Sequence, residues 1–308
     1  MEQGFLDLAR TAYWLVVALF LALALWLPAT RRGKIGAAAL VAIIALIPTL
    51  INLQHREERK EIAAREQVLV SQATRRFEEL CKGAGVKIYR TVDDVDAVLL
   101  LKVRPTLEFK DQADPMLPGA AMAGEAFGDA YIESFLGVEN RDRGYGKGGR
   151  GTISGPAGTD FPRYRYVDII DPNDGQRYRY SYVKDGSTGQ ISSGAQGMGD
   201  SSRLVRRIAD GLAPRYAVDY EDIVNREDRK LWIAGTTIRV RDQQSGEILG
   251  EYTTYLMDGG MGTTDGTRAP WSHASHSRFR CPQIDGATST HTRYFVDGVL
   301  KPAKGISQ

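Results

Sequence analysis

Two histidines and one cysteine fall within a short stretch of the sequence, and these residue types bind zinc. His273, His276 and Cys281 could each supply a nitrogen or sulfur ligand. Their spacing matches no established zinc motif, and a fourth ligand such as Asp258 or Asp265 would be needed. The pattern therefore favours a surface loop over a metal site. We predict no metal and no cofactor.

The chain contains two cysteines, Cys81 and Cys281, which lie far apart in the sequence. In an oxidising compartment, a disulfide between them would tie the segment that ends near Cys81 to the C-terminal part. Both could instead be small buried apolar side chains. The sequence leaves these two interpretations open.

A glycine-rich run from Gly144 to Thr152 invites a phosphate-binding interpretation. A P-loop requires Gly-Lys followed by Ser or Thr, between a strand and a helix. Here Gly148 follows Lys147, and no helical pattern follows. We therefore expect a surface loop.

The acidic cluster Asp93, Asp94 and Asp96 is a further candidate, because neighbouring carboxylates can do acid–base chemistry or bind a cation. Acidic residues just before a strand more commonly face solvent. The sequence also lacks a Gly-x-Ser-x-Gly nucleophile motif. We therefore name no catalytic residue, and the sequence leans against an enzyme.

Tyrosine and arginine residues alternate along two predicted strands, at residues 164–170 and 176–183. The residues that could form a partner surface are Tyr164, Tyr166, Tyr178, Tyr180, Arg177 and Arg179. Such alternation can bind single-stranded nucleic acid, and it also fits strands with one packed face. Acidic and basic residues are equal in number from His55 onward, so we expect no nucleic-acid partner. Another protein is the expected partner, because tyrosine and arginine are favoured at interface hot spots.

Apolar runs and turn residues predict the elements that must position these side chains. Strands are expected at residues 86–90, 96–103, 164–170, 176–183, 231–240 and 248–256. The turns Asp171-Pro172-Asn173-Asp174-Gly175 and Gln243-Gln244-Ser245-Gly246 join the last four into two hairpins. Helices are expected at residues 203–212 and 291–300. Residues 83–308 are thus predicted to be a soluble α+β domain with antiparallel β-hairpins and a few helices.

Two N-terminal stretches, residues 11–30 and 35–54, contain no charged side chain. A helix of about 20 residues can cross a hydrocarbon core of about 30 Å. We therefore predict a transmembrane helical hairpin over residues 1–54, with the lipid bilayer as a partner. An amphipathic stalk helix is expected to follow over residues 55–82.

A cleaved signal peptide and a buried helical hairpin are the alternatives to this anchor. A signal peptide has a basic start and a short apolar run, whereas Glu2 and Asp7 precede a long one. The basic connection Arg31-Arg32-Gly33-Lys34 favours a cytoplasmic turn and a periplasmic domain. Basic residues after residue 54 favour the reverse orientation. The expected location is the bacterial inner membrane, crossed twice, with the domain in the periplasm.

Several stretches resemble a group of uncharacterised proteobacterial inner-membrane proteins. These have an N-terminal two-helix hairpin and a soluble C-terminal domain. The stretches are CKGAGVKIYRTVDDVDAVLLLK, EDRKLWIAG, GEILGEYTTYLMD, RAPW and TRYFVDGVLKP. The resemblance covers most of the C-terminal part and implies a bacterial envelope setting. It implies no activity, cofactor or catalytic residue.

The sequence therefore favours a membrane-anchored, non-enzymatic binding protein of the bacterial envelope, with an immunity protein against a toxic effector as one specific form. One alternative is a membrane-associated effector or sensor with a cytoplasmic domain. Another is an envelope enzyme that acts through His273 and His276 or through the Asp93–Asp96 cluster. The oligomeric state is open.

Overall fold

The chain forms two compact units, Met1–Val68 and Leu69–Gln308. The computed structural model describes residues 2–26, 30–140, 151–153, 163–184, 202–275, 279–283 and 291–303. Helix α1 spans Glu2–Trp26, and helix α2 spans Arg31–Cys81. The last turns of α2 therefore belong to the second unit.

The transmembrane hairpin expected over residues 11–30 and 35–54 is wrong. Among the described residues, no helix is both long enough and apolar enough to cross a bilayer. The charge-free stretch that begins at Ile35 is part of α2, which begins at Arg31 and continues through the charged residues after position 54 to Cys81. The stalk helix expected over residues 55–82 thus extends it without a break.

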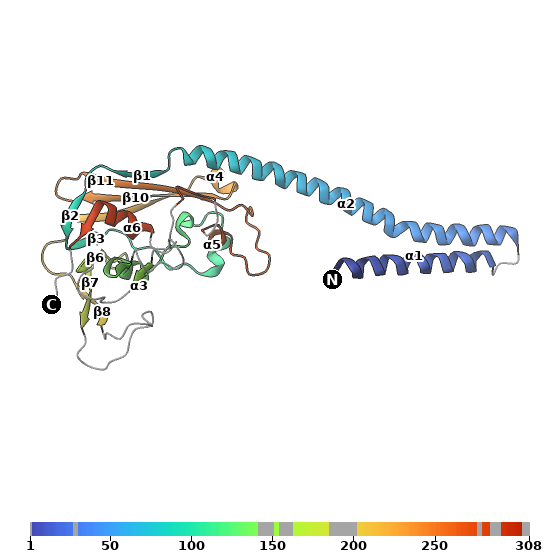
Figure 1. Ribbon diagram of the computed structural model, residues 1–308, viewed down its shortest axis with the longest axis horizontal. Coiled ribbons are helices and arrows are strands. Elements are labelled where there is room, and N and C mark those ends of the chain that lie inside the picture. Colours follow the sequence, from blue (N-terminus) through green and yellow to red (C-terminus); the bar gives the residue numbers. More distant parts are fainter. Residues whose placement is uncertain are drawn as a thin grey trace. The chain divides into compact units, whose positions relative to one another are not determined.

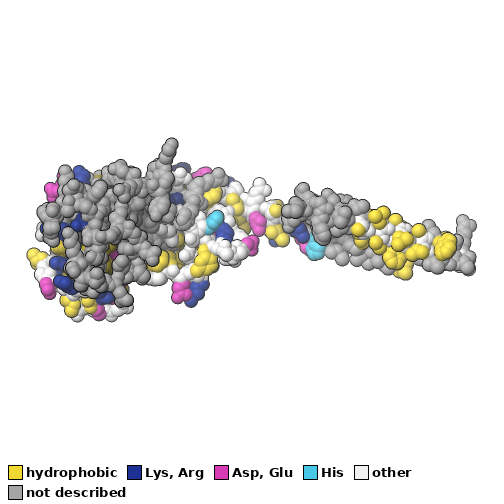
Figure 2. Space-filling view, turned by 60° about the horizontal axis from the view of Figure 1, so that its bottom comes forward, with side chains coloured by type: hydrophobic (Ala, Val, Ile, Leu, Met, Phe, Trp, Pro, Cys, Tyr) yellow, Lys and Arg dark blue, Asp and Glu magenta, His cyan; other side chains and the backbone are white. Residues whose placement is uncertain are grey.

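None of the residues of the first unit whose side-chain exposure is described is buried. Trp14, Leu19, Phe20 and Trp26 of α1 are all exposed, and apolar side chains gather on the described surface of this unit (Figure 2). The first buried residue along the described chain is Ala73, which lies in the second unit. The buried residues that the structure describes lie in Leu69–Gln308.

A large mixed sheet forms the second unit (Figure 1). Its described strands follow the order β1-β11-β10-β9-β3-β6-β7-β8, and β12 pairs with β11 beside β1. The strands are β1 (Gly85–Ile88), β3 (Ala97–Leu100), β6 (Tyr166–Ile170), β7 (Arg177–Lys184), β8 (Ser202–Ile208), β9 (Tyr216–Ile223), β10 (Ile233–Asp242), β11 (Ile248–Met257) and β12 (Arg280–Cys281). The fold is therefore α+β, but β3 runs parallel to both of its neighbours, β6 and β9.

Short helices and small ladders complete the unit. They are β2 (Val92–Val95), the 3-10 helices η1 (Phe109–Ala113) and η2 (Ala120–Met122), α3 (Asp129–Leu136), β4 (Val138–Asn140), β5 (Gly151–Ile153), α4 (Arg226–Lys230), α5 (Pro270–Ser275), α6 (His291–Val299) and β13 (Leu300–Pro302). Strand β13 pairs in parallel with β2, and β4 pairs with β5.

The two faces of the sheet are covered by different elements. Side chains alternate across a strand, so Ile238 and Tyr252 face one side and Ile233 and Met257 the other. The first side packs against α3 and α6 in the main core. The second side packs against the last turns of α2, through Ala73 and Phe77. Figure 1 shows α2 and α6 on opposite sides of β10 and β11.

Elements that depend on local signals lie where the sequence predicts them. The two hairpins form as β6–β7 and β10–β11, and both are antiparallel. Strand β3 is fully buried, and α6 begins at His291 as expected. The helix predicted at residues 203–212 is wrong, because residues 202–208 form β8. They pair with β7 from Lys184 to Tyr178.

Candidate ligand-binding site

The described residues among the zinc candidates do not come together as a metal site. His273 is exposed on α5, and Cys281 is bonded to another cysteine, so its sulfur is not a free thiolate ligand. His276 lies outside the described residues. Within the described ranges, no group of three or more His, Cys, Asp or Glu residues could hold a metal ion.

The acidic cluster before β3 makes surface ion pairs. Asp93 pairs with Lys301 at 2.8 Å, and Asp96 pairs with Arg165 at 3.0 Å. The two carboxylates thus pair with basic residues of two different segments, β13 and the segment that leads into β6. The glycine-rich run from Gly144 lies outside the described residues as far as Arg150. The structure therefore adds nothing to a phosphate-binding interpretation there.

The pleat of the β6–β7 hairpin divides the tyrosines and arginines proposed as one partner surface. Tyr180 is buried in the main core, and Tyr178 packs against its edge. Tyr164 is buried just before β6, where its hydroxyl donates to the carbonyl of Leu300 at 2.7 Å. Tyr164 and Tyr180 are therefore unavailable to a partner, because the core needs their rings.

The arginines of this hairpin lie on the other face. Arg179 donates from Nε and Nη2 to the buried carboxylate of Asp168, at 2.7 and 2.9 Å. Its guanidinium also stacks over the ring of Tyr166, 3.8 Å from the ring centre. Arg177 lies 3.6 Å from the same carboxylate. Tyr166, Arg177 and Arg179 thus remain together, as a half-buried group that neutralises Asp168.

The structure joins Cys81 and Cys281 in a disulfide across 200 residues. The bond ties the end of α2 to β12, which is only two residues long. The residue before Cys281 is Arg280, whose side chain is buried. The disulfide therefore helps to position Arg280.

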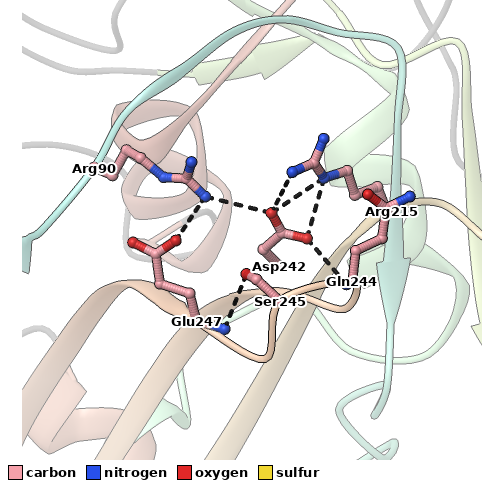
Figure 3. Close-up of polar contacts among 6 residues, drawn as sticks. All are labelled: Arg90, Arg215, Asp242, Gln244, Ser245 and Glu247. Carbon is pink, nitrogen blue, oxygen red and sulfur yellow. Dashed lines mark hydrogen bonds and ion pairs between the residues drawn. The ribbon is translucent and has the colours of Figure 1, made fainter.

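A second charged cluster closes the β10–β11 turn (Figure 3). The carboxylate of Asp242 is completely buried and accepts three hydrogen bonds from Arg215, the shortest at 2.7 Å. Arg90 donates to it at 3.3 Å and also pairs with Glu247 at 2.8 Å. The amide of Gln244 donates at 3.0 Å. The donors from Arg90, Arg215 and Gln244 are thus bonded to Asp242, which makes this cluster a structural one.

Replacing Asp242 with asparagine is expected to destabilise the protein by about 2 to 4 kcal/mol, because it removes the anion of Arg215 and one of the two carboxylates that Arg90 contacts. Hydrogen bonds from Arg215 lower the pKa of Asp242 to about 2 from 3.8. The contribution of the carboxylate is therefore complete above pH 4 and is lost as the pH falls from about 4 to about 2. Measured by urea unfolding, the free energy of unfolding should fall less between these pH values in Asp242→Asn than in the wild type. An equal fall in the two proteins would contradict a stabilising role for the ionised Asp242.

A different kind of cluster lies inside the main core, and we call it the buried arginine cluster. It consists of Arg104, Glu125, Arg280, His291 and Thr292. The exposed fraction is 4% for Arg104, 4% for Glu125, 6% for Arg280 and 2% for His291. Charged residues are almost never buried to this degree unless they are paired.

Segments from all over the second unit supply these side chains. Arg104 follows β3, and its carbonyl accepts the amide of Gly128 just before α3 at 2.8 Å. Glu125 follows η2, where its amide donates to Met122 at 2.8 Å. Arg280 lies on β12, which pairs with β11. His291 and Thr292 form the first turn of α6.

Part of the cluster is hydrogen-bonded. The carboxylate of Glu125 accepts from the amide of Thr292 at 3.3 Å and from its hydroxyl at 3.2 Å. The start of a helix favours a carboxylate, because its amides are unpaired and its dipole is positive there. Arg280 Nη1 lies 3.3 Å from Nδ1 of His291 and 3.8 Å from the sulfur of Met122. Arg104 Nη1 lies 3.5 Å from a carboxylate oxygen of Asp222.

The remaining donors have no partner among the residues that the structure describes. They are Nε and Nη2 of Arg104, Nε and Nη2 of Arg280 and Nε2 of His291. Tyr252 lies beside the Arg280 guanidinium, close enough for each to affect the pKa of the other, but no hydrogen bond is completed between them. A buried, unpaired polar group costs about 1 to 3 kcal/mol, and more when it is charged. Such a cluster costs stability unless something else occupies its donors.

Burial also sets the protonation states of the cluster. It raises the pKa of Glu125 to about 7, although Arg104 and Arg280 both act to lower it. Burial and the charge of Arg280 lower the pKa of His291 to about 3, so this imidazole is neutral at pH 7. Burial lowers the pKa of Arg280 as well, but a guanidinium remains charged in proteins.

The raised pKa of Glu125 predicts a specific pH dependence. In the folded protein Glu125 keeps its proton up to about pH 7, whereas in the unfolded chain it loses the proton near 4.5. The folded state therefore binds more protons in this window, and stability falls as the pH rises from about 4.5 to about 7. In Glu125→Gln this loss should be absent. The free energy of unfolding of the variant, relative to that of the wild type, should therefore be about 2 to 3 kcal/mol higher at pH 8 than at pH 5.

Denaturant titrations of wild type and Glu125→Gln at both pH values measure this difference. His291 acts in the opposite direction, since its lowered pKa removes stability as the pH falls from 6.5 to about 3. It is present in both proteins, so its effect cancels in the comparison. Equal pH dependence in the two proteins would show that Glu125 is already ionised in the folded state.

None of the residues in the buried arginine cluster stands out in a motif. The one usable signal is Glu125, which is a single charge within the apolar stretch Ala120-Ala121-Met122-Ala123-Gly124-Glu125-Ala126-Phe127. A lone charge in such a stretch is commonly buried and paired. Arg104 and Arg280 carry no comparable signal. Their proximity to Glu125 depends on the tertiary fold.

No protein-family model, no curated protein and no solved structure matches this chain. Its function must therefore be argued from the geometry of the buried arginine cluster.

Proposed function

We propose that the chain is a non-enzymatic binding protein that works in an oxidising compartment and holds its ligand at the buried arginine cluster. The observation that carries this proposal is the set of unpaired donors on Arg104 and Arg280, in a place where both side chains are more than nine-tenths buried. Proteins retain such costly groups chiefly where function needs them.

The chemistry of the cluster favours binding over catalysis. Guanidinium groups donate hydrogen bonds but do not act as nucleophiles or bases at neutral pH. His291 is a poor base, because its pKa is about 3. Thr292 donates both its hydroxyl and its amide to Glu125, so this carboxyl holds the start of α6.

The disulfide supports the proposed compartment. Disulfides persist in secreted and periplasmic proteins and are rare in a reducing cytosol. The bond between Cys81 and Cys281 holds together segments that are 200 residues apart. This is consistent with the bacterial envelope as the location. A protein partner in that compartment would have to present the bound group on a side chain or a chain end.

An enzyme that uses Glu125 is the second candidate. A general acid or base works best with a pKa near the working pH, and the pKa of Glu125 is raised to about 7. In that case Glu125 would transfer the proton and the arginines would bind the substrate. The two candidates differ in what they require of Glu125.

Thermal-shift screening of the oxidised full chain against periplasmic metabolites and peptides tests the proposal. We expect at least one compound to raise the melting temperature of the wild type and of Glu125→Gln, but not that of Arg280→Met. Each stabilising compound is then incubated with the wild type and checked for turnover. If the wild type converts a compound and Glu125→Gln does not, the chain is an enzyme and the binding-protein proposal is rejected. Equal shifts in wild type and Arg280→Met would reject the site.

A further inference from the structure

The geometry points to an oxyanion, either a carboxylate or a phosphate group, as the ligand that binds the Nε and Nη2 atoms of Arg104 and Arg280. This inference rests on the proposed function, since it names the class of ligand held at the same site. It is drawn from which atoms are unpaired, from the charges around them and from their burial.

The unpaired atoms lie on the same edge of each guanidinium group. The Nε–H bond and one Nη2–H bond of an arginine point in parallel, so this edge can hold two oxygens of one carboxylate or phosphate. In both residues the other nitrogen, Nη1, faces another side chain. It faces Asp222 in Arg104, and it faces His291 and Met122 in Arg280. Both arginines therefore keep free the edge that is suited to bidentate binding.

The surrounding charges leave the two guanidinium groups incompletely neutralised. Asp222 is the carboxylate that pairs with Arg104, and it also acts on the pKa of Arg229. Glu125 is only partly ionised at pH 7, because burial raises its pKa to about 7. His291 is neutral, and the phenols of Tyr131 and Tyr252 have raised pKa values. A buried positive charge without a partner is unfavourable, and one bound anion would neutralise it.

Other ligand classes fit this site less well. A cation would be repelled by two guanidinium groups that lie close enough for the charge of Arg104 to lower the pKa of Arg280. A neutral carbonyl group would accept a hydrogen bond but leave the charge buried. An apolar group would leave every one of the unpaired donors without a partner. Only an oxyanion satisfies both the donors and the charge.

Oxyanion binding should be linked to the proton on Glu125. A bound anion disfavours a second negative charge nearby, so it raises the pKa of Glu125 further. By reciprocity, protonated Glu125 favours the anion. The titratable or charged groups that act on Glu125 are Arg104 after β3 and Arg280 on β12, and Glu125 in turn acts on Tyr131 of α3 and Tyr252 of β11. We therefore expect binding to be tighter at pH 6 than at pH 8.

Isothermal titration of the oxidised full chain with sodium phosphate and with sodium acetate tests the inference, with sodium chloride as the control salt. We expect saturable binding of at least one oxyanion to the wild type, weakened about tenfold or more by Arg104→Met and by Arg280→Met. Arg207→Met is the control variant, because it removes an exposed arginine of β8, and it should leave the affinity unchanged. For acetate, which is fully ionised at both pH values, the difference between pH 6 and pH 8 should disappear in Glu125→Gln.

The possible outcomes separate this inference from the proposed function. If neither oxyanion binds, but another compound does and needs Arg280, the ligand class is wrong and the binding site stands. If an oxyanion binds equally well to Arg104→Met, Arg280→Met and Arg207→Met, the site is wrong. Circular dichroism of each variant shows whether it is folded. Arg280→Lys provides a second test of bidentate binding, because lysine keeps the positive charge but lacks the two parallel N–H donors of arginine.

Discussion

Replacing both cysteines with serine is expected to lower the free energy of unfolding by about 4 to 5 kcal/mol. The disulfide between Cys81 and Cys281 closes a loop of 200 residues, and in the chain-entropy model long loops gain the most from closure. A loss of this size is a large part of the total stability of a typical domain. Urea unfolding of the oxidised wild type and the Cys81→Ser/Cys281→Ser variant measures the difference.

Reduced wild-type protein is the control for this experiment. A reductant should bring the wild type to the stability of the double variant, and it should leave the variant unchanged. The same treatment should weaken ligand binding, because β12 carries both Cys281 and Arg280. A loss below about 1 kcal/mol would mean that the bond constrains the unfolded chain far less than its loop length predicts.

Two buried arginines are expected to respond in opposite ways to the same substitution. Arg293 of α6 donates Nε to Asp297 at 2.6 Å, and its Nη1 donates to the carbonyls of Ser134 and Phe135 at the end of α3. Arg293→Met should cost about 3 to 5 kcal/mol, because it leaves a buried carboxylate and helix carbonyls unpaired. Arg280→Met should cost nothing or stabilise the protein by up to about 2 kcal/mol, because its guanidinium is largely unpaired.

The comparison is internally controlled, since both residues are arginines buried to more than nine-tenths in the same unit. Chemical denaturation of the two variants in buffer without oxyanions provides the measurement. A large loss in Arg280→Met would mean that its guanidinium is paired in solution. That result would remove the energetic argument for a ligand at the cluster.

Hairpins and the terminal helix could be predicted from the sequence because their signals are local. The turn from Asp171 to Gly175 fixes the β6–β7 hairpin, in which the Asp171 side chain accepts the amide of Asn173 at 2.9 Å and Gly175 has a φ of +69°. Backbone conformations of this kind are chosen by turn residues, and no distant contact is needed. The apolar run from Ala97 to Leu100 likewise predicts a buried strand.

Tertiary pairing explains why residues 203–208 form a strand and not the predicted helix. Leu204, Val205 and Ile208 satisfy helical spacing, but they lie in the strand β8, where Leu204 packs against the main core and Ile208 is exposed. The pairing of β8 with β7 decides between the two conformations, and it lies outside any local window. The transmembrane prediction depended on the absence of charge in two short windows. The stalk helix expected after the second window does continue from it, within α2 from Arg31 to Cys81.

The candidate site could not be predicted because its members share no sequence neighbourhood. Arg104, Glu125 and Arg280 come from three loops or strand ends, and α6 adds Thr292. Metal or nucleophile motifs depend on fixed spacings along the chain. A cluster assembled by the sheet and by a disulfide has no such spacing.

Heteronuclear NMR of the arginine Nε–H groups tests the central claim most directly, because it observes the atoms that are proposed to bind. On addition of phosphate or acetate, we expect the Nε–H resonances of Arg104 and Arg280 to shift and to exchange more slowly with solvent. The Nε–H resonance of Arg293, which is already bonded to Asp297, should not move. Unchanged resonances of Arg104 and Arg280 at saturating concentrations of both anions would contradict the account.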